Sequence, residues 1–123
     1  MKPINDLRRL LPRTLGEFAL DVDEELVFPF PQVLEIIRFA TSKGIAVLGV
    51  EAVEVRGREL RFEGWSVYDS STRFEGDWQQ YVRSNNASAR EVVERNPCGE
   101  DHGYLLTAVS KDEFDLLPRG GPA

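Results

Sequence analysis

The sequence has only one cysteine, Cys98, one histidine, His102, and no long uninterrupted run of apolar residues. A single cysteine excludes an internal disulfide, and one cysteine with one histidine cannot supply the four ligands of a structural zinc site. A membrane-spanning helix needs about 20 apolar residues, and a secretory signal needs an apolar stretch behind its positive charges. Neither is found here. These absences predict a soluble protein of the reducing cytoplasm with no metal, no cofactor and no membrane association.

Length and composition are those of an ordinary globular domain. The 123 residues include 41% hydrophobic and 29% charged types, which is close to average usage and sufficient for a hydrophobic core. A chain of this size is expected to form one domain. We therefore expect a single domain over residues 1–118 and a flexible C-terminal tail over residues 119–123.

Acidic residues outnumber basic ones by 21 to 15, which gives a net charge of −6 at pH 7. This balance disfavours binding to nucleic acid, whose phosphates are themselves negative. Two acidic groups lie outside the clearly periodic segments: Asp21, Asp23, Glu24 and Glu25 form the first, and Asp69, Glu75 and Asp77 form the second. Such groups are ordinarily solvated surface, but they also serve as steering surfaces for a basic partner.

Hydrophobic periodicity predicts alternating helices and strands. Helical spacing of apolar residues, with caps or prolines at the ends, predicts helices over 4–11, 31–43 and 77–96 and a short one from Ser110, which forms a capping box with Glu113. β-branched and alternating segments predict a hairpin of 45–55 with 59–68 and a further strand over 104–109. Residues 15–28 fit neither period. The expected fold is therefore α+β, with a three- or four-stranded, mainly antiparallel sheet and helices packed against it.

Three local irregularities accompany this pattern. The apolar residues of 45–55 change parity after Ala52, which indicates a bulge or burial on both faces. Gly64 in the middle of the next strand, beside Trp65, indicates another bulge or a close approach of the backbone. The capping box of Ser88 and Glu91 indicates that the third helix breaks near Asn85 and Asn86.

Catalytic signals are weak. Cys98 and His102 share the segment CGEDHG, where a nucleophile and a base could meet, and Glu100, Asp101 and His102 could offer metal ligands. Nothing in a glycine-flanked loop enforces either geometry, so a polar turn is the simpler interpretation. Glycine-rich phosphate loops and the G-x-S-x-G and H-E-x-x-H motifs are absent. We therefore expect no enzymatic activity, and keep a Cys98/His102 enzyme as the less favoured alternative.

Aromatic residues alternate with carboxylates between residues 64 and 82. Trp65, Trp78 and Tyr81 have the spacing of core residues. Phe74 and the surrounding acids are instead expected to be exposed, where rings and carboxylates together form the kind of hot spot that binds a basic protein.

Over residues 30–110 the chain resembles the small immunity proteins of bacterial polymorphic toxin systems. The resemblance is carried by KGIAVLGVEAVEV, then ELRFEGWSVYD, then the helix WQQYVRSNNASAREVVE, and finally GYLLTAVS. It implies a non-enzymatic antidote that binds a cognate toxin domain and occludes its active site, and it assigns no individual contact residues.

The partner-binding candidates follow from the charge and aromatic patterns instead: Asp21, Asp23, Glu24, Glu25, Asp69, Phe74, Glu75 and Asp77. A toxin that acts on nucleic acid needs a basic cleft, which an acidic protein can occupy. Two other functions stay open, a cytosolic adaptor or regulatory domain and a small-molecule-binding domain with an apolar pocket between the sheet and the Trp78 helix. The oligomeric state is also open.

Overall fold

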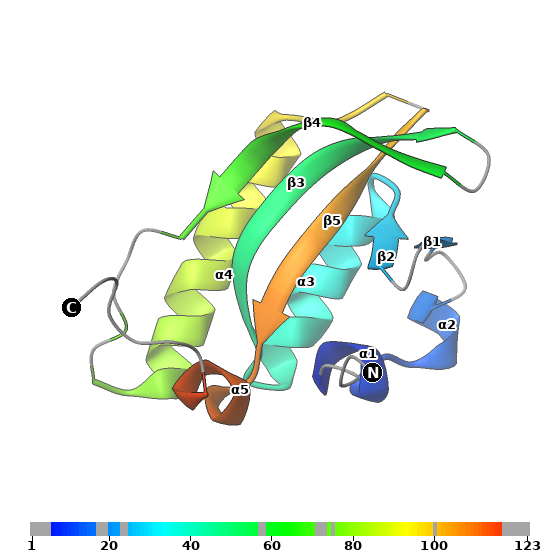
Figure 1. Ribbon diagram of the computed structural model, residues 1–123. Coiled ribbons are helices and arrows are strands. Elements are labelled where there is room, and N and C mark those ends of the chain that lie inside the picture. Colours follow the sequence, from blue (N-terminus) through cyan, green and yellow to red (C-terminus); the bar gives the residue numbers. More distant parts are fainter. Residues whose placement is uncertain are drawn as a thin grey trace.

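The computed structural model describes residues 6–16, 20–22, 25–56, 59–70, 74, 76–99 and 101–116. These residues form one antiparallel sheet of five strands in the order β1-β2-β5-β3-β4. Figure 1 shows α3 and α4 side by side behind the sheet, with the short helices at its lower end. The elements are α1 (Asp6–Leu10), α2 (Arg13–Gly16), β1 (Leu20–Val22), β2 (Glu25–Phe28), α3 (Gln32–Ser42), β3 (Ala46–Arg56), β4 (Glu59–Asp69), α4 (Trp78–Arg95), β5 (His102–Val109) and α5 (Lys111–Asp115).

The predicted α+β class is confirmed. The sheet has more strands than the sequence predicts, because residues 15–28, which fit neither the helical nor the strand period, contain two of them. Within 15–28, β1 and β2 form a hairpin that joins the sheet through Val27 opposite Leu105 and Phe28 opposite Tyr104. The contact between β2 and β5 is close, because a Cβ placed on Gly103 would lie 2.3 Å from Val27 Cγ1. The predicted tail, 119–123, lies outside the described residues.

The hydrophobic core lies between the sheet and the pair α3 and α4. The predicted stripe on α3 is confirmed, since Val33, Ile36, Ile37 and Ala40 are all buried. They pack with Ala89 and Val93 of α4 and with the inward-facing residues of β3 and β5. Burial of apolar surface stabilises the fold by roughly 25 cal/mol per Å². Within the described parts of the chain, no helix combines the length and apolar character that a membrane crossing requires.

The turn from α3 to β3 is fixed by a glycine and a tryptophan. Gly44 has φ of +69°, a left-handed conformation that favours glycine and ends the helix as the sequence predicts. The indole Nε1 of Trp78, the first residue of α4, donates a hydrogen bond of 2.7 Å to the Gly44 carbonyl. This bond ties the start of α4 to the start of β3.

Register shifts are present where β3 meets its neighbours, in agreement with the bulges that the sequence offered as one alternative. The pairing of β3 with β5 shifts between Val47 and Gly49, and its pairing with β4 shifts between Val50 and Glu51 and again between Ala52 and Glu54. The last shift falls beside Gly64. Bulges add bend and twist to a strand, and β3 and β4 curve strongly across the face of the molecule (Figure 1).

The predicted break in the third helix is wrong, because α4 runs without interruption from Trp78 to Arg95. Asn85 and Asn86 are buried instead and bond to the backbone of β3. Asn86 Oδ1 accepts from the Val47 N–H at 2.9 Å and its Nδ2 donates to the Ile45 carbonyl at 2.8 Å, while Asn85 Nδ2 donates to the Val47 carbonyl at 2.8 Å. Two side chains thus act as hydrogen-bond partners for the backbone at the start of β3.

Replacement of Asn86 is therefore expected to be costly. Asn86→Ala leaves the Val47 N–H and the Ile45 carbonyl without this partner, and each unsatisfied buried group costs about 1–3 kcal/mol, so we expect a loss of about 2–4 kcal/mol in the free energy of unfolding. Urea denaturation followed by circular dichroism measures it. Ser88→Ala, on the exposed side of the same helix, is the control and should change stability by less than about 0.5 kcal/mol. Equal effects of the two substitutions would contradict a structural role for Asn86.

Candidate functional site

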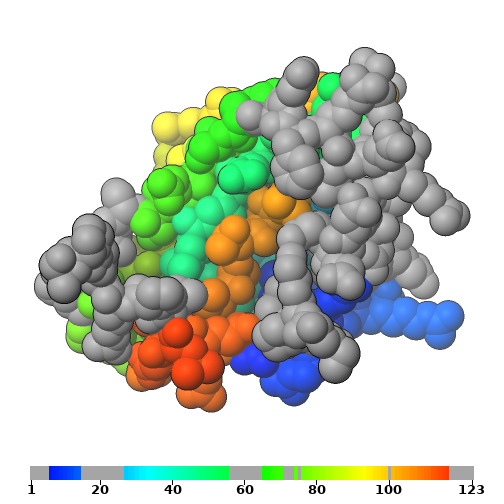
Figure 2. All heavy atoms as spheres, viewed as in Figure 1, coloured from blue at the N-terminus to red at the C-terminus, as the bar shows by residue number. Residues whose placement is uncertain are grey.

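The face of the sheet turned away from α3 and α4 carries the candidate site. Val50 and Ala52 belong to the core, so Gly49 and Glu51, which alternate with them, lie on the other face. Figure 2 shows side chains of β3, β4 and β5 at the molecular surface on this face. The register places Thr107 and Asp69 on either side of Gly49, and Leu105 and Ser66 on either side of Glu51.

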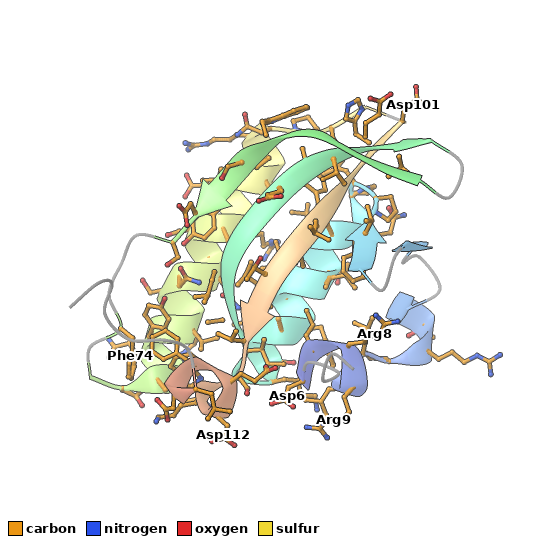
Figure 3. The ribbon with its side chains drawn as sticks, viewed as in Figure 1. Asp6, Arg8, Arg9, Phe74, Asp101 and Asp112 are labelled. Carbon is orange, nitrogen blue, oxygen red and sulfur yellow. The ribbon has the colours of Figure 1, made fainter. Side chains whose placement is uncertain are left out.

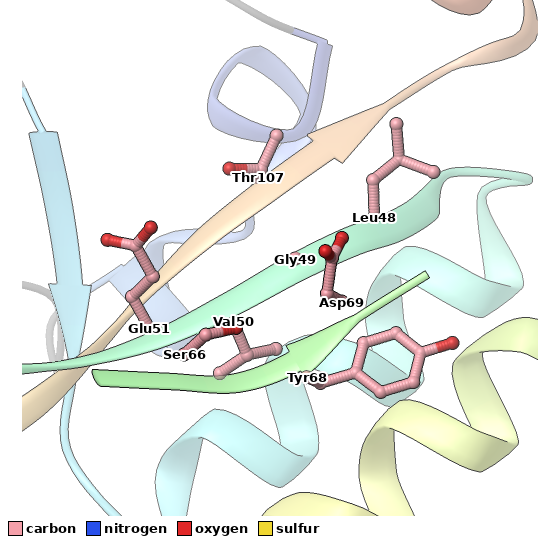
Figure 4. A pocket seen from close by; sticks show the side chains of 8 residues that line it. All are labelled: Leu48, Gly49, Val50, Glu51, Ser66, Tyr68, Asp69 and Thr107. Atoms are coloured by element: carbon pink, nitrogen blue, oxygen red, sulfur yellow. The ribbon is translucent and has the colours of Figure 1, made fainter. Parts of the chain in front are cut away.

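Residues of β3, β4 and β5 surround a shallow hollow of about 390 Å³ on this face. Figure 4 shows Glu51, Asp69 and Thr107 projecting from the strands on the same side. Gly49 leaves the floor between them without a side chain, and an added Cβ would lie at an ordinary contact distance of 3.7 Å from Thr107 Cβ. The lining residues are Leu48, Gly49, Val50, Glu51, Ser66, Tyr68, Asp69 and Thr107.

The chemistry of the hollow is acidic and hydroxylic. Glu51 and Asp69 are exposed carboxylates, and Ser66 and Thr107 are exposed hydroxyls. Among the described residues that line the hollow, none is basic. Two carboxylates on one concave surface give it a negative potential, which attracts cationic groups. We call Glu51, Ser66, Asp69 and Thr107 the acidic face.

Tyr68 connects the acidic face to the core. Its ring points toward α4 (Figure 4), where its hydroxyl donates to Asn85 Oδ1 and lies 3.3 Å from the Asn85 carbonyl oxygen. Burial raises the pKa of Tyr68 above its usual value of 10.0, while a hydrogen bond with Ser70 acts in the opposite direction. The strand that carries Ser66 and Asp69 is therefore fixed to the helix behind it.

Three of the predicted partner-binding residues have described side chains. Asp69 lies at the end of β4 and belongs to the acidic face. Asp77 is exposed, and its side chain caps α4 by accepting from the Gln80 N–H at 3.2 Å. Phe74 is half-buried rather than exposed, because its ring packs edge-on against Trp78 and Tyr81 at centroid distances of 5.2 and 5.4 Å. It also meets Phe114, so it belongs to an aromatic cluster and not to an open surface.

The other predicted residues are placed only in part. Asp21 lies in β1 opposite Leu26, and Glu25 begins β2. Their side chains, together with Asp23, Glu24 and Glu75, lie outside the described residues. Asp21 lies on the edge strand β1, with β2 and β5 between it and β3, and Glu25 lies on the neighbouring strand β2.

Of the three aromatics predicted to be core, Trp78 and Tyr81 are buried and Trp65 is not. Trp65 is 52% exposed. It lies on β4, an edge strand with a neighbour on one side only, so the sheet covers only part of its large ring. The indole instead packs at a centroid distance of 5.7 Å against His102.

The segment between α4 and β5 does not assemble a Cys–His pair. Among the described contacts, no hydrogen bond joins Cys98 to His102, and the His102 ring rests on Trp65. The hydroxyl of Tyr104 holds the segment by accepting from the Cys98 N–H at 2.9 Å and donating to the Asn96 carbonyl at 2.7 Å. Glu100 lies outside the described residues, among which no group of His, Cys, Asp and Glu side chains could hold a metal ion.

The alternative of a small-molecule-binding domain would need an apolar pocket between the sheet and α4. In that space Val82, Asn85, Asn86 and Ala89 are buried against β3. The hollow lies on the opposite face, and Glu51, Ser66 and Thr107 were not among the predicted residues. The available signal was the presence of Glu51 and Glu54 within the apolar segment 45–55, because a charged side chain marks where a largely apolar strand reaches solvent.

The buried hydroxyl of Tyr104 predicts a pH dependence. Burial is the main cause that raises its pKa above 10.0, and the neighbouring Cys98 raises it further. Because the folded-state pKa exceeds the unfolded value, the stabilisation is complete below about pH 10 and is lost as the pH rises through the folded-state pKa. We expect the free energy of unfolding, measured in urea from pH 8 to pH 11, to fall less steeply in Tyr104→Phe than in the unmodified chain. Parallel profiles would contradict this assignment.

Comparisons with protein families, with characterised proteins and with solved structures find no significant match to this chain. The case for a function therefore rests on the arrangement of the described residues.

Proposed function

We propose that this chain is a non-enzymatic protein-binding domain, specifically a small immunity protein that binds a basic toxin domain through the acidic face and occludes its active site. The observation that carries the proposal is the concave surface over β3, β4 and β5, which no described helix covers and in which Glu51 and Asp69 flank a floor without a side chain at Gly49.

The shape of this surface favours a macromolecule over a small ligand. Small-molecule sites bury about 70–90% of their ligand and are mostly apolar. The hollow is shallow, and its exposed groups are carboxylates and hydroxyls. A protein partner can cover such a surface by matching its curvature, and a stable complex buries about 800 Å² on each side. The acidic face would form the centre of that larger contact.

The charge of the chain favours a basic partner. The net charge of −6 and the two carboxylates of the hollow both attract a positively charged partner. Electrostatic steering of this kind raises association rates by about 10- to 1,000-fold at low salt. A toxin that cleaves or modifies nucleic acid presents a basic cleft to its substrate, and an acidic surface that enters this cleft blocks it without any reaction.

Co-expression tests the proposed function directly. The C-terminal domain of the protein encoded immediately upstream, the position where the proposal places the toxin, is expressed in a bacterial host with and without this chain. We expect the toxin domain alone to arrest growth and the unmodified chain to restore it. Binding to that domain without restored growth would support an adaptor function instead, and absence of binding would reject the immunity function.

Charge reversal tests the acidic face. We expect Glu51→Lys with Asp69→Lys to slow association with the same toxin domain by about 10-fold or more at low salt, because steering is replaced by repulsion. The difference should shrink at high salt, where charges separated by more than a Debye length are screened. Stopped-flow fluorescence at two salt concentrations measures both rates.

A matched control has the same change in net charge on the helical side of the molecule. Glu91 and Glu94 are exposed on α4 and pair with Arg95 and Arg90. Exposed ion pairs of this type contribute at most about 1 kcal/mol to stability, so Glu91→Lys with Glu94→Lys should fold normally. If both double variants slowed association equally, net charge alone would explain the effect and the acidic face would not be the binding surface.

A further inference from the structure

The half-exposed indole of Trp65 and the partly buried imidazole of His102 form a pair of rings that the proposed contact with the acidic face does not use. We call Trp65 and His102 the ring pair. The strands that carry them, β4 and β5, are not neighbours, because β3 lies between them. Ala52 of β3 is opposite both Trp65 and Tyr104, and Glu54 is opposite His102. The indole thus reaches past the small side chain of Ala52 to contact the imidazole at 5.7 Å.

This contact orients the indole while half of it stays in solvent. The two rings are inclined at 53°, and Trp65 is 52% exposed. Tryptophan is among the side chains that contribute most binding energy at protein interfaces, because it buries a large area with little loss of conformational entropy. An exposed indole held in place by a second ring has already lost part of its freedom, which reduces the cost of binding.

The ring pair is adjacent to the acidic face. Ser66, the next residue of β4, lines the hollow on the side away from the helices, and alternation along the strand places Trp65 on the helical side. β4 is the edge of the sheet. A partner that covers Ser66 and Asp69 and continues over this edge reaches Trp65 without crossing another strand.

An acidic residue near the ring pair favours a cation as the group that binds this indole. Asp101 is exposed and immediately precedes His102, and Figure 3 places it at the same end of the sheet as the start of β5. An arginine guanidinium stacks flat on an indole and donates several hydrogen bonds in its plane, whereas a lysine ammonium is a strongly hydrated point charge. We propose that Trp65 is the anchor of the partner interface and receives an arginine side chain of the basic toxin domain. This inference rests on the proposed function.

Model peptides test the inference without the toxin. The ¹⁵N-labelled chain is titrated with capped tetra-arginine and capped tetra-lysine peptides and observed by NMR. We expect the arginine peptide to shift the Trp65 indole N–H and the His102 amide saturably and to bind about two- to fivefold tighter than the lysine peptide, as a cation–π contact at an exposed site implies. The Trp78 indole, buried and bonded to Gly44, is the internal reference and should not move.

Two variants complete the test. Trp65→Ala should remove the preference for arginine, while Leu116→Ala, which truncates a side chain that is 85% exposed on another part of the surface, should retain it. Equal affinity for the two peptides, with shifts confined to Glu51, Ser66 and Asp69, would overturn the role of Trp65 and leave the acidic face in place. Absence of shifts at the ring pair in every titration would also overturn it, whereas the proposed function is decided separately by the growth experiment.

Discussion

Two adjacent asparagines of α4 hold the first residues of β3, and the rest of the described fold depends on that strand. β3 pairs with both β4 and β5, yet its pairing with β5 is irregular after Val47. The pairing of β3 with β4 begins only at Gly49, so the buried backbone groups of Val47 have no β4 partner, and leaving them unsatisfied would cost about 1–3 kcal/mol each. Asn85 and Asn86 bond to both backbone groups of Val47 and to the Ile45 carbonyl. Hydrogen bonds are directional, so these contacts fix where α4 lies along the strand, which apolar packing alone specifies less closely.

The position of β3 also separates the two faces of the sheet. Residues on one side of the strand meet α3 and α4 and are buried, whereas Glu51 on the other side is exposed. The shifts at Glu51 and Glu54 change which residues of β4 lie opposite β3, and the accompanying bend makes the uncovered face concave. The hollow thus follows from the irregular pairing of β3 with β4, which begins a few residues beyond the part of β3 that the asparagines hold. A flat strand in this position would present the carboxylates on a level surface with less contact area for a partner.

Local chemical signals predicted most of the fold, and contacts between distant residues accounted for what was missed. The stripe on α3, the cap at Asp77, the left-handed Gly44 and the capping box of Ser110 with Glu113 each depend on a few neighbouring residues, so the sequence was sufficient for them. Asn85 resembles a helix breaker locally and is a core residue only because Val47, 38 positions away, needs a partner. The exposure of Trp65 likewise depends on the strand order of the sheet, and the burial of Phe74 depends on its contact with Phe114. A local sequence pattern contains neither kind of information. Of the acidic face, only Asp69 was among the predicted residues.

The residues assigned to binding are largely independent of those that stabilise the fold. Glu51, Ser66 and Thr107 point away from the core, and substitutions at exposed positions usually change stability by less than about 0.5 kcal/mol. Trp65 is on the helical side but half in solvent. A protein whose task is to match one particular partner benefits from this separation, because specificity is a difference between affinities and can be altered by contact residues alone. The buried asparagines and the bulged strand supply the rigid shape, and the exposed residues on that shape determine which partner is bound.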